Sequence, residues 1–150
     1  MEDLSISEMV TILKRNYLGY LAYIFKGRPS SVPITYHFDD ANDAIISYSA
    51  EGHKMDAMRE NSLVSLQVEE IESNNNWLSV LAHGTFEELK GIESKSQLDQ
   101  FAEGVKSTNT QKEHSHPEFI SEFSSTSNSK NVPIVYRFKI NEITGKRKDT

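Results

Sequence analysis

Hydrophobic positions near the N-terminus follow the period of a helix. Between residues 5 and 16, apolar side chains stand at positions 6, 9, 10 and 13, the i, i+3, i+4, i+7 spacing of an amphipathic helix. Ser5 and Glu8 have the spacing of a capping box, in which each side chain accepts a hydrogen bond from the other residue's backbone N–H group. We therefore expect a helix over residues 5–16 that packs its apolar stripe on the rest of the domain.

From residue 17 onward the hydrophobic period is mostly two, which predicts β-strands. Polar and Gly-containing turns separate the runs at short spacing, as in hairpins, and favour an antiparallel sheet. Two more helices are expected, one over residues 53–61 and one opened by a second capping box, Ser94 with Gln97. A mainly β protein is expected, with six strands that close into a small barrel and helices on its outside. The expected strands cover residues 17–25, 31–38, 44–50, 63–70, 77–89 and 132–140.

The chain of 150 residues suits a single domain, residues 1–150, with its own hydrophobic core. Residues 107–131 are rich in Ser, Thr and Asn, and they are expected to form a polar loop excursion with a short helical piece at residues 117–123. The basic tail, residues 144–150, is expected to be frayed.

Composition and charge narrow the classes of function. The net charge of −6, from 16 basic and 22 acidic residues, argues against a broad nucleic-acid surface, which needs clustered Lys and Arg. The absence of cysteine excludes disulfides and cysteine nucleophiles. No run approaches the roughly 18 apolar residues of a membrane span, and the acidic N-terminus lacks a signal-peptide pattern, so a cytoplasmic protein is expected. The histidine spacing does not predict a metal site.

A strand-to-helix junction is the first place that could carry chemistry. Ser47 and Ser49 share one face of an expected strand, Gly52 follows, and a helix then begins with His53 and Lys54. A helix N-terminus offers free N–H groups and the positive end of a dipole, which suit a phosphate. Lys54 opposes that dipole, and a bound anion would offset the conflict. The alternative is an ordinary capped helix with Lys54 in solvent.

The strand over residues 31–38 is the second candidate. Pro33 cannot donate to a sheet ladder, so this strand is expected at an edge, a bulge or a gap that faces a ligand. Pro33, Thr35 and His37 share its non-core face, along which a planar ring could lie; the alternative is a plain edge strand. Trp77 could stack on an aromatic ligand or a partner subunit, or it could be an ordinary core or rim residue.

Several short segments occur in a characteristic order along the chain. They are Gly19-Tyr20-Leu21-Ala22, Gly27-Arg28-Pro29, residues 32–36, residues 48–61, Trp77-Leu78-Ser79-Val80 leading to Gly84, and Ile143-Thr144-Gly145-Lys146. Together they resemble the pyridoxamine-phosphate-oxidase-like flavoproteins, nearest the branch that contains the nitroimidazole-resistance proteins. The resemblance covers most of the chain except the Ser-rich excursion.

The resemblance implies a split β-barrel that forms a homodimer with flavin mononucleotide (FMN) at the subunit interface. In that family the segment matching residues 49–54 holds the FMN phosphate, and the strand matching residues 32–36 lies along the isoalloxazine ring. The segment matching Trp77 and Ser79 completes the site, often from the other subunit. The candidate cofactor-binding residues are therefore Val32, Pro33, Ile34, Thr35, Tyr36, Ser47, Tyr48, Ser49, His53, Lys54, Trp77 and Ser79.

The expected function is that of an FMN-dependent oxidoreductase with a small, unidentified substrate. True pyridoxamine-phosphate oxidases carry an Arg-rich C-terminal substrate motif, whereas this chain has Gly145-Lys146-Arg147-Lys148, so vitamin B6 oxidation is not expected. His37 is a candidate proton donor near the ring. Two alternatives remain: a flavin-binding module without turnover, and a haem-binding relative whose first candidate ligands are His37, His83 and His114.

Overall fold

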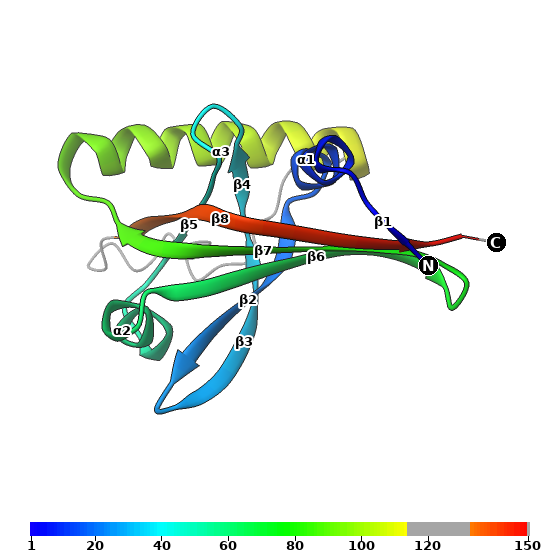
Figure 1. Ribbon diagram of the computed structural model, residues 1–150. Coiled ribbons are helices and arrows are strands. Elements are labelled where there is room, and N and C mark those ends of the chain that lie inside the picture. The colour runs from blue at the N-terminus through cyan, green and yellow to red at the C-terminus, as the bar shows by residue number, and fades with distance from the viewer. Residues whose placement is uncertain (114–132, 150) are drawn as a thin grey trace.

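A computed structural model describes residues 1–113 and 133–149, which form one antiparallel sheet flanked by three helices (Figure 1). The strand order is β3-β2-β6-β7-β8-β5-β4, and β1 pairs with β8. The helices are α1 (Ile6–Arg15), α2 (His53–Glu60) and α3 (Gly91–Glu113). The strands are β1 (Glu2–Asp3), β2 (Leu18–Phe25), β3 (Arg28–Thr35), β4 (His37–Asp39), β5 (Ala44–Ser49), β6 (Leu63–Ser73), β7 (Asn76–Glu88) and β8 (Ile134–Lys148).

The sheet closes on itself because its two ends are consecutive in the chain. Only Tyr36 separates β3, which pairs with β2, from β4, which pairs with β5. The Tyr36 N–H group donates a hydrogen bond to the carbonyl of Tyr17 (2.8 Å), so the bend itself is held by the backbone. The result is a split antiparallel β-barrel, open where β3 and β5 part. Its edge strand β3 contains Pro33, which confirms the edge position expected for that residue.

Two clusters of buried side chains hold the barrel together. The larger fills its interior and includes the apolar stripe of α1, as the helical spacing predicted. The Tyr36 hydroxyl donates to the carbonyl of Leu13 (2.8 Å) and joins that helix to the barrel. The smaller cluster lies under α3, where the rings of Tyr48 and Phe101 meet edge to face with centroids 4.8 Å apart. Strand β5 is therefore buried on both faces.

The capping box at the start of α1 is confirmed. The Glu8 N–H group donates to Ser5 Oγ (3.2 Å), and the Ser5 N–H group donates to Glu8 Oε1 (3.0 Å). Glu8 also accepts a hydrogen bond from Arg147 on β8 (2.7 Å). The hydrogen bond from the Ser5 backbone, followed by that from Arg147, lowers the pKa of Glu8 to about 2. Through its hydrogen bond with Arg147, the capping residue Glu8 therefore also links α1 to β8.

The sheet differs from the expectation in its strands. All six expected strands are present, but the described residues form eight, because the stretch expected as one strand divides at Tyr36 into β3 and β4, and the short β1 was missed. The expected fraying of the tail is wrong for residues 144–148. Strand β8 continues to Lys148, which is paired with Trp77 of β7, and β1 pairs with its other edge. Backbone hydrogen bonds to β7 and β1 hold this segment in the sheet, and its basic composition gives no sign of them.

Helix α3 is longer than expected at both ends. It begins at Gly91 and not at Ser94, and it runs to Glu113, so the expectation of a loop over residues 107–113 is wrong. A polar sequence can continue a helix because the backbone hydrogen bonds are internal, and Phe101 and Val105 anchor this one to the barrel. The rest of the expected excursion, with its helical piece at 117–123, lies outside the described residues. Within the part of the chain that is described, no helix is long and apolar enough to cross a membrane.

Candidate functional site

The split in the barrel brings two of the candidate segments together. Ser47 on β5 donates a hydrogen bond from its hydroxyl to the carbonyl of Thr35 on β3 (2.7 Å), and both residues are buried. This bond joins the two strands at the place where they separate. Thr35 and Ser47, which are distant in sequence, are therefore in direct contact.

Several candidate residues can meet a ligand only through their backbone. The side chain of Tyr36 is fully buried, and burial raises the pKa of its hydroxyl. Ile34 points into the barrel core, and Tyr48 packs under α3. Val32 and Pro33 are more exposed, on the edge strand β3. The Ser49 hydroxyl donates to the carbonyl of Ala50 (2.8 Å), so it must rotate before it can donate to a phosphate.

The first turn of α2 is open to an anion. Its N-cap residue, Gly52, has no side chain that could cap the helix, in contrast to the complete box on α1. A Cβ atom built on Gly52, the N-cap residue, would meet nothing within 4 Å, which leaves room for an anion to approach the N–H groups. Lys54 is half-buried in this turn, and the His53 ring lies 5.3 Å from the ring of Phe25 on β2. The residues present therefore fit a phosphate group.

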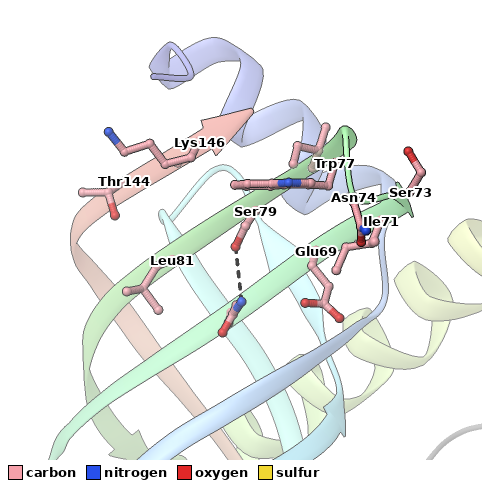
Figure 2. Close-up of a pocket in the computed structure, with 12 residues that line it drawn as sticks. Glu69, Ile71, Ser73, Asn74, Trp77, Ser79, Leu81, Thr144 and Lys146 are labelled. Atoms are coloured by element: carbon pink, nitrogen blue, oxygen red, sulfur yellow. Dashed lines mark hydrogen bonds between the residues drawn. The ribbon is translucent and has the colours of Figure 1, made fainter. Parts of the chain in front are cut away.

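Trp77 and Ser79 lie in a different place. They line a groove of about 610 Å³ on the outer face of the β6–β7 hairpin and of β8, where Ser79 accepts a hydrogen bond from Gln67 (3.3 Å) (Figure 2). Apolar side chains such as Ile71 and Leu81 share this groove, and Lys146 lines it from β8 with its ammonium group ion-paired to Asp3 of β1. Sequence reasoning did not place Gln67 or Lys146 in a site, because only strand pairing brings them beside Ser79.

Helix α2 lies at the base of the long β6–β7 hairpin (Figure 1), away from the tip where Trp77 stands. Trp77 pairs with Ile71, near the tip, whereas α2 connects to Leu63, at the base. The eight residue steps from Leu63 to Ile71 span about 26 Å along an extended strand. The candidates on β3 lie nearer to the Trp77 groove, because Pro33 pairs with Tyr20, which pairs with Gln67.

His37 does not lie open beside a ring site. It packs beneath α3, where a Cβ atom on Gly104 would come within 2.1 Å of His37 Nδ1. Burial lowers the pKa of His37, and nearby Asp39 acts in the opposite direction. Its expected role as a proton donor near the ring is therefore replaced by a contact with a helix.

The other histidines are also separate from one another. His83 Nδ1 lies 2.6 Å from Ser65 Oγ on the adjacent strand, and His114 lies outside the described residues. Within residues 1–113 and 133–149, no three side chains of the metal-ligating types gather.

The fold defines a split-barrel protein, in which the N-terminus of α2 is a candidate site for an anionic ligand. A family model described as pyridoxamine 5'-phosphate oxidase matches residues 5–147, and the chain belongs to that family. An uncharacterized protein of Rhizobium meliloti is 36% identical over 86 residues, which are 57% of this chain and 56% of that protein. The match therefore spans little more than half the length of this curated relative.

Solved structures share the whole fold. A protein of Mesorhizobium loti named as FAD-binding is 27% identical, with a TM-score of 0.76 and coverage of 99% of this chain and 97% of the other. A candidate 5-nitroimidazole antibiotic resistance protein of Bacteroides thetaiotaomicron is 15% identical, with a TM-score of 0.69 and coverage of 96% and 85%. An FAD and haem binding protein of Mycobacterium smegmatis is 15% identical, with a TM-score of 0.73 and coverage of 100% and 75%. The family resemblance seen in the sequence is confirmed.

Proposed function

We propose that this chain binds a flavin, specifically FMN, and uses it as a redox cofactor. The observation that carries the proposal is the uncapped first turn of α2 beside the split between β3 and β5. Free N–H groups at a helix N-terminus, with Lys54 in the same turn, provide for one phosphate group. The family and the FAD-binding relative at 27% identity support a flavin as the ligand.

In this proposal the isoalloxazine ring lies along the free edge of β3. That edge strand leaves backbone N–H and C=O groups unpaired by the sheet, and these can hydrogen-bond the polar atoms of the ring. Pro33 is exposed there, whereas Thr35 is buried next to Ser47. Bound flavin would take up and pass on a hydride or electrons, while the chain would bind it, orient it and limit its contact with water.

The proposal also specifies which flavin is bound, namely FMN. One open helix terminus and one lysine provide for a single phosphate, as in FMN. Two of the structural relatives are named for FAD, which would also need a place for its second phosphate and its adenosine. The mass of the released ligand separates these cases.

We further propose a homodimer in which Trp77 and Ser79 of one copy complete the flavin site of the other. The position of Trp77 near the tip of the β6–β7 hairpin, away from the first turn of α2 at its base, supports this arrangement. The outer face of the sheet also exposes large apolar side chains, with Tyr20 46% and Ile71 63% accessible. Apolar surface in that position is typical of a face that another protein covers.

The test is the visible absorbance spectrum of the purified protein, followed by mass spectrometry of any ligand it releases. An oxidised-flavin spectrum with the mass of FMN supports the proposal, and reduction by NADH or NADPH with reoxidation by an acceptor supports turnover. Bound flavin that is never reduced leaves a binding module. A haem spectrum points to the haem-binding alternative, and a colourless protein that does not take up added FMN overturns the proposal.

A further inference from the structure

Arg59, near the end of α2, contacts carboxylates from three parts of the chain. Its Nη1 and Nη2 atoms donate to the two carboxylate oxygens of Glu51 (2.7 and 3.1 Å), in the loop before the helix. Its Nε atom donates to Glu88 at the end of β7 (2.8 Å), and Asp56 lies 3.7 Å away, one turn back along α2. The guanidinium thus ties the loop before α2 to the helix and to the sheet.

The position of Glu51 makes this contact unusual. Glu51 directly precedes Gly52, the N-cap residue of α2. A carboxylate near a helix N-terminus is favoured by the dipole and can accept hydrogen bonds from the free N–H groups. The Glu51 carboxylate instead reaches along the helix to Arg59, seven residues beyond Gly52, or about 10 Å of helix rise. The N-cap residue itself, Gly52, has no side chain that could cap the first turn in its place.

Glu51 would otherwise compete with a phosphate. Its hydrogen bond to Arg59 lowers its pKa, so the carboxylate stays ionised at neutral pH. Without the guanidinium, that charge could swing to the N–H groups of the first turn, or it would repel a phosphate bound there. Two-thirds of the Glu51 side chain is exposed, so its own conformation is held by little else than Arg59.

We infer that Arg59 is a positioning residue that holds the Glu51 carboxylate away from the first turn of α2 and so keeps this turn free for the flavin phosphate, an inference that rests on the proposed function. Arg59 itself is two turns away and does not contact the ligand. Loss of Arg59 should therefore weaken only the binding of the cofactor's phosphate and not that of its ring. An experiment can test this by comparing flavins with and without the phosphate.

The experiment measures the dissociation constants of the full-length apoprotein for FMN and for riboflavin, which lacks the phosphate. Arg59→Met keeps much of the aliphatic stem and removes the charge. We expect this variant to bind FMN about tenfold more weakly, equivalent to ~1.4 kcal/mol, and riboflavin as wild type. The double variant Glu51→Gln/Arg59→Met should recover most of the FMN affinity, and Glu51→Gln alone should bind FMN at least as well as wild type.

Arg15→Met is the matched control, since Arg15 makes a similar two-point contact with Glu70 at the end of α1. It should leave both dissociation constants unchanged. Equal weakening of FMN and riboflavin by Arg59→Met, or no recovery in the double variant, would show that Arg59 only stabilises the fold. If Glu51→Gln weakens FMN binding, Glu51 is itself a ligand and the inference fails. Wild-type protein that binds neither compound overturns the proposed function, and this inference with it.

Discussion

Lys54 stands in the first turn of α2, the end of a helix at which a positive charge is least favourable. Met55 and Met58 of the same helix are fully buried, so packing fixes the helix and leaves Lys54 beside its open N-terminus. The unfavourable position becomes favourable if an anion binds there. A role for this charge in binding a phosphate is therefore a prediction that substitution of Lys54 can test.

Lys54→Ala should weaken FMN binding by about 1.5–3 kcal/mol, the range for a hydrogen bond to a charged group. Riboflavin binding should change much less, because the contact is to the phosphate. Titration of apoprotein with each compound, followed by flavin fluorescence, measures both constants. Lys26→Ala is a suitable control, since Lys26 lies in the turn between β2 and β3. An FMN dissociation constant equal to that of wild type would remove Lys54 from the site.

At the scale of elements, α3 is placed by a close approach to β4. Gly104 lets the helix backbone lie directly on the His37 ring, where a Cβ atom would be 2.1 Å from Nδ1. The neighbouring residues Phe101 and Val105 fill the cluster beneath the helix. Glycine costs an isolated helix about 1 kcal/mol relative to alanine, so its presence here is explained by packing.

Gly104→Ala should therefore destabilise the protein, although alanine is the better helix former. We expect a loss of about 1–3 kcal/mol in the free energy of unfolding, the usual cost of overpacking, measured by urea denaturation. His37→Ala in the same chain should remove most of that loss, because the added methyl group then has space. A Gly104→Ala variant as stable as wild type would contradict the close contact.

At the scale of the whole molecule, one sheet face has no cover within the described part of the chain. Tyr20, Ile71 and the Trp77 groove lie on the outer side of β2, β6 and β7. The strand registers place Tyr20 beside Gln67, which in turn is beside Leu81. This face therefore combines exposed apolar side chains with polar ones such as Gln67 and Glu69, and it is the face on which we place the proposed dimer contact.

Ile71→Lys should weaken the proposed dimer by about tenfold to a hundredfold, since a buried isoleucine contributes about 1.5–3 kcal/mol. Light scattering over a range of concentrations measures the dimer, and FMN affinity should fall with it. Ile92→Lys is the control, because Ile92 is 89% exposed at the start of α3 and away from this face. A dimer that is unaffected by Ile71→Lys would place the interface elsewhere.

Local patterns in the sequence determined the elements of this fold. The cap of α1, the alternation of the strands and the edge position of Pro33 follow from interactions between near neighbours, which the order of residues encodes directly. The family resemblance extended that reasoning to a split barrel, which the structure confirms. The candidate site residues were also chosen from the sequence, and their roles remain predictions.

Only the tertiary structure decided how those elements meet. The length of β8, the burial of His37 beneath Gly104, and the groove shared by Trp77 and Lys146 all depend on partners far away in the chain. The same holds for the ion pair between Arg59 and Glu88. Hydrogen bonds between strands and contacts across a packed core leave no periodic pattern in the sequence. A single sequence therefore shows where the strands and helices lie more clearly than it shows which residues they bring into contact.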